Sequence, residues 1–255
     1  MRRLLSVYAA GAYAFLYLPL FVLSVFSFNR SRFSVWQGFS WHWYSQVFRN
    51  EQLINAAINS LVIALSATVI STCVGALAAY AIWKRRSPWL MNSLYLSLLT
   101  PEIVTGISLL AFFQWIFRFL HVHLGIHTVI LAHVSFSLAY VVIVVLARLR
   151  TFDPVLEEAA LDLGATEWET FRRVTLPNLL PSIAAAALLC FTVSIDDYVI
   201  TSLVAGVDSE TLPMVIYAMA RKGVNPMVNA LSAMITVGLG ILIVLAERFQ
   251  TEPAS

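Results

Sequence analysis

Long apolar stretches with almost no charged residues recur along this chain of 255 residues. About 20 predominantly apolar residues are enough for a helix to cross the hydrocarbon core of a membrane. Charged residues make up 12% of the chain and hydrophobic residues 60%, whereas a soluble domain contains about 25% charged residues. Because backbone polar groups in lipid must bond within their own segment, such stretches form helices. The sequence therefore predicts an all-α integral membrane protein.

Six transmembrane helices are expected. The first follows Arg2 and Arg3 and is too long for the apolar region of a signal peptide, so we expect it to be retained. Ten lysines and arginines fall on the side that holds both termini and six on the other. Basic segments tend to stay in the cytoplasm, so both termini are expected there. The expected spans are Tyr8–Phe28, Ala57–Trp83, Trp89–Phe117, Thr128–Leu146, Leu179–Leu203 and Met227–Ala246.

The segment after the first expected span is rich in aromatic residues, namely Trp36, Trp41, Trp43 and Tyr44. Tryptophan and tyrosine are enriched at membrane–water interfaces, where an apolar ring and a polar group are both accommodated. We therefore expect this segment to lie along the outer surface of the membrane.

The largest inner loop, residues 148–183, carries strong signals for short helices. Asp153 followed by Pro154 is typical of a helix start, with proline at the first helical position. Gly164 can adopt the left-handed conformation that ends a helix. The T-x-x-E pattern from Thr166 is a capping box that starts a second short helix. The chain is then expected to break at Leu176, Pro177 and Pro181 before the fifth span.

Three acidic residues, Glu102, Asp196 and Asp197, lie well inside the expected spans. A charge at the bilayer centre costs about 3 kcal/mol, so such residues usually face a bundle interior or a water-filled cavity. By helical rise, Asp196 lies roughly 25 Å from the inner end of its span, and Glu102 lies nearer mid-depth. The two levels suggest successive stations along one pathway. Purely structural packing of these carboxylates is the alternative.

Adjacent residues on a helix point about 100° apart, so Asp196 and Asp197 cannot both face one narrow lumen. One is expected to face the pathway, and the other to meet a neighbouring helix or to bond with Thr192 or Ser194. A lumen with carboxylates and no obvious intramembrane lysine or arginine selects for cations. Tyr198 and Trp115 are candidates for cation–π contacts, although each also fits an ordinary core or interface position.

Part of the inner loop matches a known motif. Glu158, Ala159, Ala160, three residues, Gly164, nine residues and the run V-T-L-P that ends in Leu176 and Pro177 resemble the EAA motif of ABC importer permeases. Valine stands where that family has isoleucine. The resemblance implies that the loop docks into a cleft on a cytoplasmic ATPase. The chain has no G-x-x-x-x-G-K-[ST] phosphate loop, so it is not expected to be an enzyme or to bind a cofactor, and ATP with Mg²⁺ is expected on a partner.

Four longer stretches resemble the second of the two permease subunits of spermidine/putrescine importers: "FLYLPLFVLSVFSFNRSRF", "LTPEIVTGISLL", "EEAALDLGAT" and the region from "SIDDYVITSLVAG" to "NALSAMI". This resemblance implies a type I ABC importer permease architecture in a bacterial inner membrane, with two short coupling helices between spans 4 and 5. It implies residues 1–56 as a first helix with an outer segment, 57–250 as the permease domain with a coupling loop at 153–177, and 251–255 as a short cytoplasmic tail.

The same resemblance implies several partners: a second permease subunit, two copies of an ATPase, and an extracytoplasmic polyamine-binding protein. No nucleic-acid partner is expected, because the net charge is only +2. The resemblance implies that the chain is the permease subunit of an ATP-driven importer of polyamines (spermidine or putrescine) or a closely related cation. Because related permeases carry other cargos, import of another small solute is the alternative.

A proton-coupled secondary transporter, with Asp196 or Glu102 as proton carrier, is the alternative of another class. It leaves the inner loop unexplained. An intramembrane aspartyl protease needs two aspartates from different segments that share a proton. Asp196 and Asp197 are adjacent in the chain, so this class is disfavoured. His121, His123 and His127 near an outer turn, with His133 farther along, fit a polar turn and a buried hydrogen-bonded histidine better than a metal site.

Overall fold

The computed structural model describes residues 2–32, 35–85, 88–120, 122–223 and 226–250. The predicted tail at 251–255 lies outside them. The chain forms two compact units, one of Met1–Asn55 with Val215–Ser255 and the other of Ala56–Met214. The described residues are helical apart from turns, loops and one bridge between Asn29 and Phe39.

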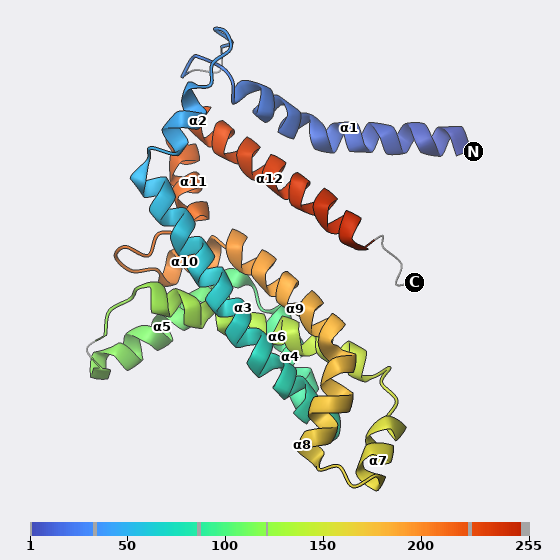
Figure 1. Cartoon of the computed structure of the whole chain (residues 1–255). Coiled ribbons are helices and arrows are strands. Elements are labelled where there is room, and N and C mark those ends of the chain that lie inside the picture. Colours follow the sequence, from blue (N-terminus) through green and yellow to red (C-terminus); the bar gives the residue numbers. More distant parts are fainter. Residues whose placement is uncertain (1, 33–34, 86–87, 121, 224–225, 251–255) are drawn as a thin grey trace. The chain divides into compact units, whose positions relative to one another are not determined.

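The first unit contains helices α1 (Arg2–Phe26), α2 (His42–Val47) and α12 (Pro226–Gln250), with α1 and α12 in contact (Figure 1). The aromatic segment predicted to lie at the membrane surface folds around Asn29, whose backbone carbonyl accepts a hydrogen bond from Trp43 Nε1 at 2.8 Å. The rings of Trp41 and Tyr44 pack on Phe28 at 4.8 Å and 5.1 Å between centroids. This segment is therefore an ordered cluster of aromatic rings.

The second unit is a bundle built mainly on three long helices. The chain runs through α3 (Glu51–Arg85, in this unit from Ala56 onward), α4 (Pro88–Leu99), α5 (Glu102–Leu120), α6 (Ile126–Leu149), α7 (Val155–Asp162), α8 (Glu167–Thr170), a π-helical segment (Phe171–Thr175), α9 (Leu176–Asp196) and α10 (Val199–Val204). Helix α11 (Leu212–Arg221) begins in this unit.

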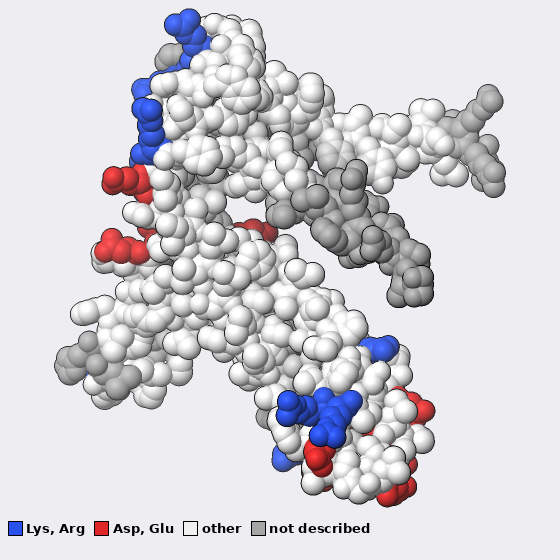
Figure 2. All heavy atoms as spheres, viewed as in Figure 1, with Lys and Arg blue, Asp and Glu red and all other residues white. Residues whose placement is uncertain are grey.

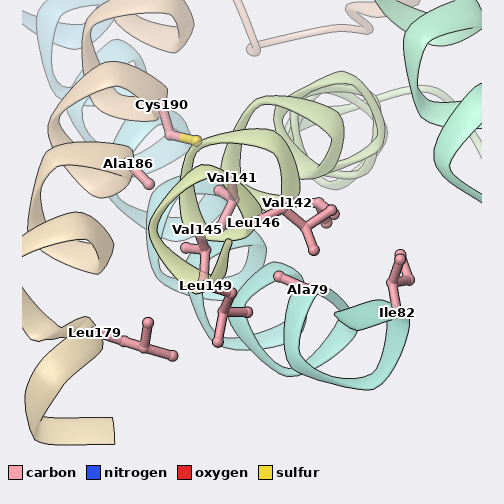
Figure 3. Packing of buried hydrophobic residues seen from close by; sticks show 10 residues of the cluster. All are labelled: Ala79, Ile82, Val141, Val142, Val145, Leu146, Leu149, Leu179, Ala186 and Cys190. Atoms are coloured by element: carbon pink, nitrogen blue, oxygen red, sulfur yellow. The ribbon is translucent and has the colours of Figure 1, made fainter. Parts of the chain in front are cut away.

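The core of the second unit lies where α6 packs against α3 and α9 (Figure 3). Val141, Val145 and Leu149 recur every four residues and therefore share one buried face of α6. A Cβ atom on Gly75 of α3 would lie 2.7 Å from the Cβ of Val141. Glycine thus permits the close approach of α3 to α6, as small residues do between membrane helices.

Within the described part of the chain, five helices are long and apolar enough to cross a membrane: Leu5–Phe26, Glu51–Arg85, Glu102–Phe119, Ile126–Leu149 and Glu167–Asp196. Each overlaps one of the first five expected spans. The sixth falls on α12, whose apolar part counts only from Pro226 to Gly238 among described residues. The total of six spans therefore stays a prediction.

The third expected span, Trp89–Phe117, is wrong as a single helix. Helix α4 ends at Leu99 and α5 begins at Glu102. Pro101 causes the interruption, because proline lacks an N–H group and disfavours helical backbone in the residue before it. Glu102 consequently lies in the first turn of a helix and not in the middle of one.

The fifth expected span, Leu179–Leu203, is wrong at both ends. Helical structure runs without a break from Glu167 through the π-helical segment to Asp196, and then stops before α10. Pro177 does not interrupt it and lies directly after the π-helical segment, where the wider turn changes the pattern of backbone hydrogen bonds. Pro181 lies inside α9, which is held by the packing of Leu179 and Ala186 in the core. The second inner helix is thus the start of the fifth span and not a separate short helix.

Candidate functional site

A cavity of about 340 Å³ in the second unit collects the acidic residues predicted for the pathway. Its lining includes Glu102 from the start of α5, Asp196 and Asp197 from the end of α9, and Tyr198. Thr105 and Tyr140 add hydroxyl groups. Residues at both helix interruptions line this cavity, so the three carboxylates share one space. Their role as successive stations along a pathway stays a prediction.

The interruption after α9 is built around Asp197, which has an extended backbone (φ −64°, ψ 128°). Its Oδ2 atom accepts hydrogen bonds from the backbone N–H of Thr201 at 2.8 Å and from the Thr201 hydroxyl at 2.7 Å. Asp197 therefore caps α10 by satisfying a free N–H group of its first turn, as side chains at helix starts commonly do.

His133 of α6 holds this junction from the other side, and its side chain is 1% exposed. Nδ1 lies 2.6 Å from the Ser194 hydroxyl and Nε2 lies 2.9 Å from the Thr201 hydroxyl. Because the single Thr201 hydroxyl proton goes to Asp197, the Nε2–H group of His133 donates to the Thr201 oxygen, and Nδ1 pairs with the Ser194 hydroxyl. A chain of hydrogen bonds thus joins Ser194, His133, Thr201 and Asp197.

The two adjacent aspartates have different surroundings. The Asp197 side chain is 6% exposed and lies 3.5 Å from His133 Nε2, whereas Asp196 is exposed at the cavity. Of the two expected surroundings for the second aspartate, contact with a neighbouring helix is observed, because Asp197 lies beside His133 of α6. Local bonds to Thr192 or Ser194 are not, because those hydroxyls donate to Leu188 O and pair with His133, respectively. The helix break, and not a 100° turn within one helix, sets the two side chains apart.

Trp115 does not line this cavity. Its ring is 62% exposed and packs on Phe119 at 5.9 Å between centroids, so its part in a pathway stays a prediction. The expectation of a buried, hydrogen-bonded histidine is confirmed by His133. Among the residues with described positions, no group of three His, Cys, Asp or Glu side chains lies close enough to hold a metal ion. His121 lies outside the described residues.

The coupling loop (residues 153–177) has the predicted corner. Gly164 has φ +89°, and Thr166 and Glu169 form the capping box, with Thr166 N donating to Glu169 Oε2 at 3.0 Å. Helix α7 begins one residue later than expected, because Asp153 Oδ1 accepts from the N–H of Val155 and Pro154 takes the cap position. The corner is therefore specified by local chemistry.

The outer face of this loop is exposed. Glu158 and Ala159 of α7 are exposed and Ala160 is partly so. Leu176 and Pro177 lie at the start of α9. Figure 2 shows charged side chains gathered at the end of the second unit that carries α7 and α8, while the sides of its helices are largely uncharged. Such a charged, exposed end suits contact with water or with a soluble partner.

Sequence reasoning missed Glu157, which precedes the motif residue Glu158. Its side chain is 4% exposed and its Oε2 atom lies 2.5 Å from Lys84 Nζ. A carboxylate among the first residues of α7 and a lysine at the inner end of α3 were both visible in the sequence, on the same side of the membrane. Their opposite charge was the signal that could have paired them.

Solved structures with the same fold are ABC transporters. The chain superposes with a TM-score of 0.70 on a bacterial ABC transporter involved in the import of the acidic polysaccharide alginate, over 98% of this chain and 95% of that one at 14% identity. It superposes with a TM-score of 0.58 on the inward-facing MetNI methionine ABC transporter, over 78% and 97% at 19% identity. The fold is that of an ABC importer permease.

Sequence comparison agrees with this class. Residues 71–251 match the model of the family described as binding-protein-dependent transport system inner membrane component, and the chain belongs to this family. It is 41% identical to the spermidine/putrescine transport system permease protein PotC of Haemophilus influenzae, over 92% of this chain and 91% of that protein. It is 39% identical to PotC of Escherichia coli K12 (97% and 93%) and to the putrescine transport system permease protein PotI of the same strain (90% and 84%).

Proposed function

We propose that this chain is the transmembrane permease subunit of an ATP-driven importer of spermidine and putrescine. The observation that carries the proposal is the cavity in which Glu102, Asp196 and Asp197 come together. Relatives whose printed names specify these polyamines, at 39–41% identity over most of the chain, support the same cargo.

The chemistry of the cavity fits a flexible polycation. Protonated amines interact with carboxylates through charge-assisted hydrogen bonds, which are stronger than neutral ones. The methylene segments between the amines can lie against the rings of Tyr140 and Tyr198, which also line the cavity. Asp196, which is exposed, offers the first contact, and Asp197 holds the shape of the cavity through His133 and Thr201.

Import needs several partners. In this proposal a second permease subunit completes the pathway, two copies of an ABC ATPase hydrolyse ATP with Mg²⁺, and an extracytoplasmic binding protein delivers the polyamine. Glu158 and Ala159, which are exposed, and Ala160, which is partly exposed, dock on the ATPase together with the corner at Gly164. Their exposure at the charged end of the second unit supports this role (Figure 2). The chain then lies in a bacterial inner membrane with both termini in the cytoplasm.

Uptake of radiolabelled spermidine and putrescine tests the proposal in vesicles that contain the purified assembly. Uptake should require ATP and the binding protein, and it should not respond to a proton gradient alone. Uptake driven by a proton gradient without ATP would indicate a secondary transporter. ATP hydrolysis stimulated by a binding protein that carries another solute, with no polyamine uptake, would retain the importer and reject the cargo.

A further inference from the structure

Glu157 is a buried carboxylate that the proposed docking surface does not use. Its Oε2 atom lies 2.5 Å from Lys84 Nζ at the inner end of α3. Its Oε1 atom accepts hydrogen bonds from the Thr175 hydroxyl at 2.5 Å and from the Tyr80 hydroxyl at 3.2 Å. One side chain of α7 thus contacts α3 and the π-helical segment at once.

Aromatic rings surround this contact. The Tyr80 ring packs on Phe171 of the π-helical segment at 4.8 Å between centroids. Lys84 Nζ lies over the rings of Tyr80 and Trp83 at 5.6 Å and 5.4 Å. Removing one partner of a shielded ion pair leaves the other charge uncompensated, which is more costly than the pair itself is stabilising. The Glu157 side chain is 4% exposed and that of Lys84 is 49% exposed, so losing Lys84 leaves a buried charge unpaired. Losing Glu157 instead removes the bonds to α3 and to the π-helical segment together.

The place of Thr175 gives this contact a mechanical consequence. Thr175 is the last residue of the π-helical segment, and α9 continues from it to Asp196 at the cation cavity. A π-helical turn within an α-helix is an irregular point that often occurs at functional positions. Glu157 bonds to this irregular point and to α3, so α7 cannot shift freely against the two helices beneath it.

We propose that Glu157 is a positioning residue for energy coupling, because its bonds fix α7 to α3 and to the start of α9. The inference rests on the proposed function, because it concerns how a movement of the coupling loop, driven by the ATPase, is transmitted to the cavity. We call the bonds of Glu157 to Lys84, Tyr80 and Thr175 the tether. With the tether in place, α7, the inner end of α3 and the start of α9 move together. Without it, α7 moves with the ATPase while α9 keeps its position.

The experiment uses the complete assembly of this chain, its partner permease, ATPase and binding protein in vesicles. Two quantities are compared among variants: spermidine taken up per ATP hydrolysed, and hydrogen–deuterium exchange of the amides of α7. The tether variants are Glu157→Ala, Glu157→Gln, Thr175→Val and Lys84→Met. Arg85→Met is the matched control, because it removes an exposed positive charge next to Lys84 without touching Glu157.

In Glu157→Ala, exchange of the α7 amides should be at least about tenfold faster, because a shielded charge pair is broken. Uptake per ATP should fall at least about fivefold while ATP hydrolysis continues. Glu157→Gln should be intermediate, since its amide oxygen can still accept from Thr175, and Thr175→Val and Lys84→Met should shift both readouts in the same direction. Arg85→Met should match the wild type.

Unchanged exchange in Glu157→Ala, Thr175→Val and Lys84→Met would overturn the tether. Faster exchange with wild-type uptake per ATP would overturn its role in coupling. The exchange measurement needs no cargo, so a wild-type assembly that takes up no polyamine would reject the proposed function and leave the tether to be judged by exchange alone. A variant that does not assemble is replaced by Thr175→Val, which changes one hydroxyl to a methyl group.

Discussion

Asp196 and Asp197 are adjacent, yet the proposed mechanism gives them different tasks. Asp196→Asn should reduce spermidine uptake by at least about tenfold at low concentration, because a lost charge-assisted contact is worth about 1.5–3 kcal/mol. Thermal stability should hardly change, because Asp196 is exposed. Initial uptake rates over a range of spermidine concentrations measure the effect. If this variant took up spermidine at the wild-type rate, Asp196 would have a packing role and no role in binding the cargo.

Asp197 should instead be needed for stability. Asp197→Ala removes the cap of α10 and leaves the Thr201 N–H and the Thr201 hydroxyl without their acceptor, which should cost about 2–3 kcal/mol of unfolding free energy. His133→Ala disturbs the same chain of hydrogen bonds, so the double variant should be less destabilised than the sum of the two. Thermal unfolding in detergent measures all three, and strictly additive losses would contradict a shared network.

At the scale of helices, the corner at Gly164 offers a test of the coupling loop. Its φ of +89° strains residues with a Cβ atom, whereas asparagine tolerates the left-handed region better than most residues. Gly164→Val should lower uptake about tenfold while ATP hydrolysis continues, because the loop no longer fits its partner. Gly164→Asn should retain most uptake. Gly11→Ala in α1, where an added Cβ meets open space, is the control, and normal uptake by Gly164→Val would argue against docking.

The sequence specified those elements whose cause is local. The capping box of Thr166 and Glu169 and the left-handed Gly164 were predicted because each depends on neighbouring residues. The helix interruptions at Pro101 and Asp197 were not predicted, because the apolar run continues past both residues. Proline before Glu102 is itself a local signal, whereas the junction at Asp197 also depends on the distant His133. His133 and Thr201 are 68 residues apart in the chain. No local pattern predicts such a pair, although a lone histidine in an apolar span signals that it needs partners.

At the scale of the whole molecule, the orientation in the membrane decides whether the coupling loop can meet an ATPase. In the predicted six-span topology, ten of the 16 lysines and arginines lie on the side of both termini and of this loop, so that side should be cytoplasmic. Single cysteines at Thr166, His123 and Ser255, in a chain with Cys73 and Cys190 changed to serine, can be labelled in intact cells by a membrane-impermeant maleimide. Position 123 should react from outside, and positions 166 and 255 only after the membrane is permeabilised.

The serine background alone should take up spermidine as the wild type does, because Cys73 is exposed and Cys190 has only a weak bond to Ser137 O at 3.7 Å. Labelling of position 166 from outside would place the coupling loop away from ATP. That single result would contradict the docking of Glu158, the role of Glu157 in coupling and ATP-driven import together. Positions 166 and 255 lie on the same side of the membrane only if the chain crosses it an even number of times between them. Labelling of position 255 but not of position 166 from outside would therefore contradict the two spans predicted between these positions.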